Sequence, residues 1–117
     1  MLRPMRTPFT RFDVPKTGSV STIVSVYDSN EAAAESQYIG KIADITGYVR
    51  SVTKTGKYWD VEFYSVLGRT LICKMSDEAN NVASSLKQGD SVTVRGKILG
   101  VPGSLSVVVE PCEVISK

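Results

Sequence analysis

The stretch Asp44-Ile-Thr-Gly-Tyr-Val-Arg50 decides the fold class, because its polar and apolar residues alternate strictly. Ile45, Gly47 and Val49 share one side of an extended chain, and the polar residues between them share the other side. This alternation predicts a strand, Ile39–Lys54, with one buried face. Val52 falls on the apolar side only if one extra residue is inserted before it as a bulge. This bulge and the central glycine are expected to bend the strand sharply.

The same period of two recurs in four later segments, which are separated by turns that contain glycine. The predicted strands are Tyr58–Val66, Thr70–Met75, Ser91–Leu99 and Leu105–Ile115. Each has one apolar face, and five such faces need a shared interior, which a closed barrel provides. Pro111 cannot donate to a strand ladder, so it predicts an edge or a bulge in the last strand.

Two segments are expected to be helical instead. Ser76–Leu86 breaks the alternation and carries apolar residues at helical spacing. Asp28–Gln37 contains an alanine run, and Asp28 or Ser29 is expected to cap it. Five strands with a helix between the third and fourth follow the order of an OB-fold. The sequence therefore predicts an all-β, five-stranded OB-fold Greek-key barrel with that helix and a short N-terminal helix.

The region before this barrel, residues 1–27, is predicted to be a flexible or extended basic arm, and residues 28–117 the OB-fold domain. Within the arm, the β-branched residues 20–27 are expected to form a short strand or an extended lead-in. The arm carries a net charge of +3 and the remainder −1. It could hold a phosphate backbone or an acidic partner, or it could be only a disordered leader.

Residues that most often serve as catalytic groups or metal ligands are scarce in this sequence. The chain has no histidine, which removes the commonest general base and metal ligand. Cys73 and Cys112 lie 39 positions apart, which is not the spacing of a zinc site. They are expected to be small buried hydrophobic residues, or a disulfide if the chain is exported. The sequence thus predicts no enzyme, no cofactor and no metal site.

Targeting signals are also missing from the sequence. No apolar run approaches the ~20 residues that would span a bilayer. The arginines near the N-terminus are not followed by the apolar segment of a secretory leader. A cytoplasmic location is therefore expected, with an exported form that has lost its leader as the alternative.

An OB barrel binds through the outer face of its second and third strands and through adjacent loops. Aromatic rings there can stack on bases, and cations can contact phosphates. The candidate binding residues are Tyr48, Arg50, Lys54, Lys57, Tyr58, Tyr64, Arg69 and Lys74. Asp60 and Glu62 share this face and would repel phosphates, unless Lys74 or Arg50 pairs with them across the strands. Trp59 has the parity of the core residues and is expected to be buried.

The chain also resembles a known family over roughly residues 28–115. The segments that carry the resemblance are Tyr38-Ile-Gly-Lys41, Ile45-Thr-Gly-Tyr-Val49, Val61-Glu-Phe63, Leu71-Ile-Cys73, Leu86-Lys-Gln-Gly-Asp-Ser-Val92, Val94-Arg-Gly96, Val107-Val-Val109 and Cys112. They are similar to those of bacterial OB-fold proteins of the tRNA-anticodon-like (tRNA_anti-like) family. The resemblance implies nucleic-acid binding, by analogy with anticodon-binding barrels. Some members resemble exported lipoproteins, whereas this chain shows no leader and no lipobox cysteine.

These observations predict a non-catalytic OB-fold module that binds single-stranded DNA or RNA with little sequence preference. The alternative is a protein-interaction or structural module, which the nearly neutral barrel and the acidic centre of the second strand favour. A third interpretation of the same side chains is a strand face that is merely solvated.

Overall fold

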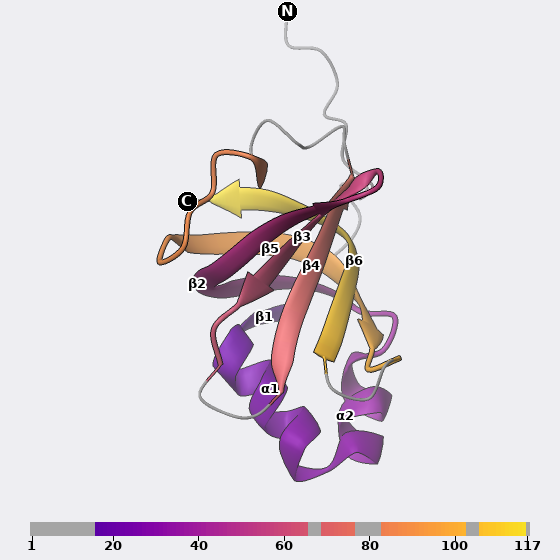
Figure 1. Ribbon diagram of the computed structural model, residues 1–117. Coiled ribbons are helices and arrows are strands. Elements are labelled where there is room, and N and C mark those ends of the chain that lie inside the picture. Colours follow the sequence, from indigo (N-terminus) through magenta and orange to yellow (C-terminus); the bar gives the residue numbers. More distant parts are fainter. Residues whose placement is uncertain (1–15, 66–68, 77–82, 103–105, 117) are drawn as a thin grey trace, which may run out of the picture.

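The computed structural model describes residues 16–65, 69–76, 83–102 and 106–116. These residues form β1 (Lys16–Ser19), α1 (Val20–Ser29), α2 (Glu31–Tyr38), β2 (Ile42–Thr55), β3 (Tyr58–Phe63), β4 (Thr70–Ser76), β5 (Ser91–Gly100) and β6 (Ser106–Ser116). Figure 1 shows the strands wrapped into a barrel, with both helices at its lower end and the hairpin between β2 and β3 at its upper end.

The barrel closes because β2 is long enough to serve two neighbours. Its first half, Ile42–Tyr48, pairs with β5, and its second half, Val49–Thr55, pairs with β3. The register shifts between Val49 and Ser51, which confirms the predicted bulge. The sheet order β1-β2-β3-β4-β6-β5, with the additional β2–β5 pairing, is a closed five-stranded barrel with β1 as an extra strand. An OB-fold barrel was predicted, whereas the strand β1 was not.

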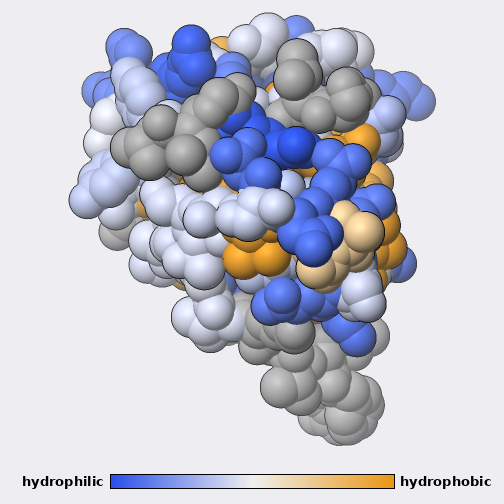
Figure 2. Space-filling model, turned by 90° about the horizontal axis from the view of Figure 1, so that it is seen from below, coloured by the Kyte–Doolittle hydropathy of each residue, from blue (hydrophilic) through white to orange (hydrophobic). Residues whose placement is uncertain are grey.

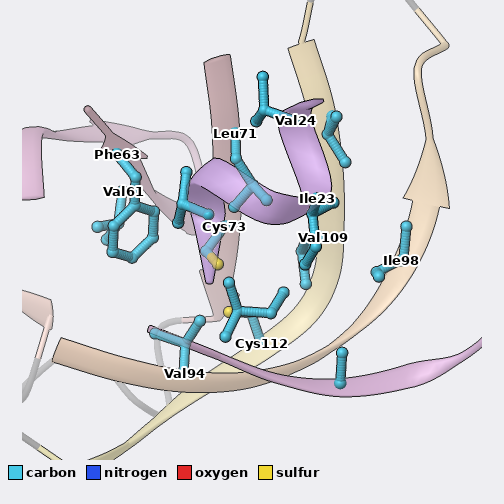
Figure 3. Packing of buried hydrophobic residues seen from close by; sticks show 14 of the residues in the cluster. Ile23, Val24, Val61, Phe63, Leu71, Cys73, Val94, Ile98, Val109 and Cys112 are labelled. Carbon is cyan, nitrogen blue, oxygen red and sulfur yellow. The ribbon is translucent and has the colours of Figure 1, made fainter. Parts of the chain in front are cut away.

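Alternation gives the barrel its core. Most inward side chains of the five barrel strands are buried, as predicted, and Figure 3 shows several of them packed together in the interior. Trp59 is only half-buried and packs against the edge of this core. Pro111 lies where two residues of β6 oppose one of β5, between the pairs Gly96–Cys112 and Ile98–Val109. The bulge predicted from this proline is therefore present, and β6 is not an edge strand.

The segment 20–27 is a helix, which corrects the prediction of a strand or an extended arm. Ser19 caps α1, because its Oγ accepts a hydrogen bond from the Thr22 backbone N–H at 3.1 Å. The buried residues of the helix are Val20, Ile23, Val24 and Tyr27, which follow the i, i+3, i+4, i+7 spacing of an amphipathic helix. Val20 packs over Gly47, where any side chain would collide with it. Residues 16–27 thus belong to the folded domain.

The predicted second helix is present but begins later than expected. α2 starts at Glu31, and its cap is Asn30, whose side chain accepts from the Ala33 backbone N–H at 3.0 Å. Neither Asp28 nor Ser29 caps it, because both belong to α1. Tyr27 and Tyr38 stack with ring centroids 6.0 Å apart, and the Tyr27 hydroxyl donates to Glu35 at 3.3 Å. Burial and the neighbouring Glu35 carboxylate raise the pKa of Tyr27 well above its usual value.

Parts of two predictions lie outside the described residues. The helix expected over Ser76–Leu86 falls largely on residues 77–82, and of its apolar positions the structure describes Ala83 and Leu86, which are both buried. The first 15 residues of the predicted arm are likewise not described.

Candidate nucleic-acid interface

The outer surface of β2, β3 and β4 is called the strand face here. Cross-strand partners in a sheet point to the same side, so the registers define its members. From the hairpin downward, its rows are Thr55, Tyr58 and Ser76, then Thr53, Asp60 and Lys74, then Ser51, Glu62 and Ile72. Sequence alternation predicted this face correctly for Tyr58, Asp60, Glu62 and Lys74.

The centre of the strand face is electrically balanced. Lys74 Nζ lies 3.1 Å from Asp60 Oδ1 and 3.2 Å from Oδ2. Arg50 Nη1 lies 3.7 Å from Glu62 Oε2, and Ser51 donates to the other oxygen of that carboxylate at 3.3 Å. The two candidate cations at this position are therefore held by the two carboxylates that sequence analysis placed beside them. Each pair lowers the positive potential that a phosphate would meet.

The hairpin end of the face carries Tyr58 and Lys57, both exposed. Lys54 is a further candidate binding residue at this end, but it pairs with Trp59 in the register and so takes the opposite side of the ribbon from Tyr58. Its Nζ lies 5.3 Å from the centroid of the Trp59 ring, a cation–π contact. The indole Nε1 is buried, and it has no hydrogen-bond partner in the structure as described. Both lysine side chains still extend into solvent at this end of the barrel.

The lower end of the face carries a second aromatic group, Tyr48 and Tyr64. The Tyr64 backbone N–H donates to the Tyr48 carbonyl at 2.9 Å, which holds these two residues together. Gln88 Nε2 donates to the Tyr64 hydroxyl at 2.7 Å and anchors that ring. Gln88 was not a predicted site residue, and no local pattern could have shown it, because it lies in a turn 24 positions along the chain.

The exposure of the tyrosines sets them apart from the core aromatics. Tyr48 is 60% exposed, Tyr58 41% and Tyr64 44%, so each offers a ring surface to a ligand. Tyr58 begins β3 and Tyr64 directly follows its last residue, so the two are six residues, or about 20 Å of extended chain, apart. The face therefore has aromatic groups at both ends and paired charges between them.

Arg69 does not lie with the other candidates. Its guanidinium is 3.2 Å from Glu31 at the start of α2, and its side chain is only 15% exposed. This ion pair ties the entry of β4 to the helices at the lower end of the barrel. Seen from below, that end is mainly hydrophilic, with smaller hydrophobic areas between the polar side chains (Figure 2).

Within the described residues, no group of three or more His, Cys, Asp or Glu side chains is placed to hold a metal ion. Among those residues there is also no helix that has the length and apolar character needed to cross a membrane.

The fold of this chain is similar to that of several proteins of known structure. A lipoprotein from Klebsiella pneumoniae that is proposed to bind nucleic acid matches with a TM-score of 0.73 and 20% identity, over 87% of this chain and 92% of its own. Asparaginyl-tRNA synthetase from Pyrococcus horikoshii matches with a TM-score of 0.52 and 24% identity, over 68% of this chain and 21% of the enzyme. An OBody bound to hen egg-white lysozyme matches with a TM-score of 0.51 and 17% identity, over 67% of this chain and 97% of its own.

These structural similarities establish the fold. No match was found among curated proteins. The model of the tRNA_anti-like family matches residues 9–113, almost the whole chain, and it also covers α1. The chain belongs to the tRNA_anti-like family of OB-fold proteins.

Proposed function

We propose that this protein is a non-catalytic module that binds single-stranded nucleic acid on the strand face, with little sequence preference. The observation that carries the proposal is the set of three exposed tyrosines, Tyr48, Tyr58 and Tyr64, at the two ends of one barrel face. Every base has a ring face that can stack on an aromatic side chain, so stacking binds single strands without reading their sequence. Family membership and the resemblance to a tRNA synthetase domain support the same ligand class.

The charges of the face shape how such a strand would bind. Lys54 and Lys57 extend from the hairpin, whereas Lys74 and Arg50 are held by Asp60 and Glu62. A strand that is stacked on the tyrosines would meet Lys57 beside Tyr58, and Lys54 where it passes around the end of the hairpin, so about two phosphate contacts are expected. Each neutralised phosphate of a single strand contributes about −0.7 to the slope of log K against log salt. The expected slope is therefore shallow, about −1.4.

The test is fluorescence anisotropy with labelled single-stranded DNA and RNA oligomers at several salt concentrations. The double variant Lys54→Glu, Lys57→Glu should bind at least tenfold more weakly, because two contacts become repulsive. Its matched control is Lys41→Glu, Lys97→Glu, which makes the same change in net charge at exposed positions near the other end of β2. Equal weakening by both variants would show that only net charge matters and would remove the hairpin from the interface.

A second pair of variants tests the tyrosines themselves. Tyr48→Ala should weaken binding by about fivefold or more, since a stacked base contributes about 1–3 kcal/mol. The control is Leu99→Ala, which removes another exposed large side chain, 43% exposed, from β5. Binding that is unchanged in Tyr48→Ala would contradict stacking at the lower end of the face. Absence of binding to either oligomer at tens of micromolar protein would contradict the whole proposal.

The balanced centre of the strand face favours a second candidate, a protein-interaction module. Two satisfied ion pairs between exposed tyrosines form a surface that a protein can cover without neutralising a large charge. An OBody, which shares the fold, is bound to lysozyme. Binding to a protein partner would persist at high salt, whereas phosphate-driven binding would fall.

A further inference from the structure

Two buried thiols face each other in the barrel core, and neither takes part in the proposed interface. Cys73 on β4 is fully buried, and Cys112 on β6 is 3% exposed. Figure 3 shows both sulfurs directed into the same part of the interior. A side-chain hydrogen bond with Cys73 is among the causes that raise the pKa of the Cys112 thiol, and both cysteines are free in the structure.

The two cysteines lie at the end of the pairing between β4 and β6. These strands are parallel and pair from Thr70–Ser106 to Cys73–Val109, so Cys73 is the last residue of β4 that pairs with β6. Beyond it, β6 bulges at Pro111 and continues with β5 alone. Cys112 is the first inward residue after the bulge and lies opposite Gly96. A covalent bond at this point would join two strands where their hydrogen bonds stop.

Gly96 lies opposite Cys112 on β5. An ideal Cβ on that glycine would lie 3.4 Å from Cys112 Cβ, an ordinary contact distance, so β5 packs directly against this flank of Cys112. The two side chains enter the same part of the interior from strands that pair with each other, so a disulfide would join neighbouring strands.

We propose that Cys73 and Cys112 form an intramolecular disulfide when the chain folds in the presence of a small disulfide such as oxidised glutathione. One protein thiolate attacks the glutathione disulfide and releases one glutathione as its thiolate. The second protein thiolate then displaces the other glutathione from the mixed disulfide. The two protein thiols lose two electrons and two protons, and one glutathione disulfide is reduced to two glutathione molecules.

The bond forms during folding rather than afterwards, because the folded barrel shields both sulfurs. Burial raises the pKa of the Cys112 thiol well above its usual value, and contact with Cys73 and the charge of Glu113 raise it further. A protonated, buried thiol is a poor nucleophile. Folded reduced protein should therefore react slowly with oxidised glutathione, whereas the unfolded chain should react fast.

The test compares wild-type protein refolded with reduced glutathione alone and with oxidised glutathione, followed by acid quench, denaturation, alkylation and mass spectrometry. We expect the oxidised sample to lose two mass units and to take up no alkylating reagent. Its Tm should exceed that of the reduced sample by about 10 °C or more, since the bond closes a long loop. Dithiothreitol should reverse both changes.

The control is Cys112→Ser, in which Cys73 has no partner. This variant should show no difference in Tm between the two redox conditions and should take up one glutathione or one alkylating group. Two alkylated cysteines, or glutathione adducts in place of the internal bond, in the oxidised wild-type sample would overturn the proposal. The comparison of oxidised with reduced wild-type protein tests the proposal even if Cys112→Ser does not fold.

Discussion

Gly96 is where a single hydrogen in place of a side chain allows β5 to cross the bulge of β6. A Cβ at this position would collide with Val109 and would lie 3.0 Å from the Pro111 carbonyl oxygen, which belongs to backbone and cannot rotate away. We expect Gly96→Ala to lower the free energy of unfolding by about 1–3 kcal/mol, because the strands must move apart. Urea denaturation, monitored by tryptophan fluorescence, measures this.

Gly18 provides the matched control for that substitution. It also lies in a strand, but a Cβ there would meet the Ile23 side chain at an ordinary distance of 3.9 Å. Gly18→Ala should therefore change the free energy of unfolding by no more than about 0.5 kcal/mol. Equal destabilisation by the two substitutions would mean that crowding at the bulge is not the cause.

The same scale shows how much of the candidate site the sequence could predict. The outward direction of Tyr48, Tyr58 and Tyr64 follows from alternation, which depends on neighbouring residues only. Lys54 follows the bulge, so its strand parity is that of Val52, and it lies on the opposite side of the ribbon from Tyr58. The partner of Arg69 is Glu31, 38 positions away on a helix, and no local pattern contains that information.

At the scale of elements, α1 shows a conflict between residue propensity and spacing. Its sequence, Val20-Ser-Thr-Ile-Val-Ser-Val-Tyr27, is rich in β-branched residues, which favour strands. Its apolar positions nevertheless have helical spacing, and the open lower end of the barrel offers them a surface on which to bury. The helical spacing is visible in the sequence, but the tertiary contact that favours a helix over a strand is not. The five barrel strands were predictable because propensity and spacing agree in them.

The junction between α1 and α2 gives a prediction about a cap. Asn30 accepts the Ala33 backbone N–H at 3.0 Å, so Asn30→Ala should lower the free energy of unfolding by about 1 kcal/mol. Asp28→Ala, two residues earlier, removes a carboxylate from the last turn of α1, where the helix dipole disfavours negative charge. It should be neutral or slightly stabilising. Thermal unfolding of both variants distinguishes the caps, and a larger loss for Asp28→Ala would contradict the assignment of Asn30.

At the scale of the whole molecule, charge is arranged so that acids and bases cancel on the barrel. Asp60 holds Lys74 on the strand face, and Asp44 holds Arg95 on the outer side of the β2–β5 seam with a short contact of 2.7 Å. The two carboxylates therefore have the same kind of partner on different surfaces. Neutralising either carboxylate changes the net charge of the protein by the same amount. Two such variants therefore test where a phosphate-binding surface lies.

Asp60→Asn should strengthen binding to a single-stranded oligomer, because Lys74 loses its carboxylate partner and can contact a phosphate. One additional contact would steepen the slope of log K against log salt by about 0.7. Asp44→Asn adds the same charge to the protein but away from the strand face, so its effect should stay within a factor of about two. Both carboxylates are partly exposed, so loss of either ion pair should cost at most about 1 kcal/mol of stability. Both variants should therefore remain folded in the binding experiment. Equal strengthening by both variants would mean that phosphates respond only to the overall field of the molecule. Strengthening confined to Asp60→Asn would place the path of the nucleic acid across β3 and β4, between the two groups of tyrosines.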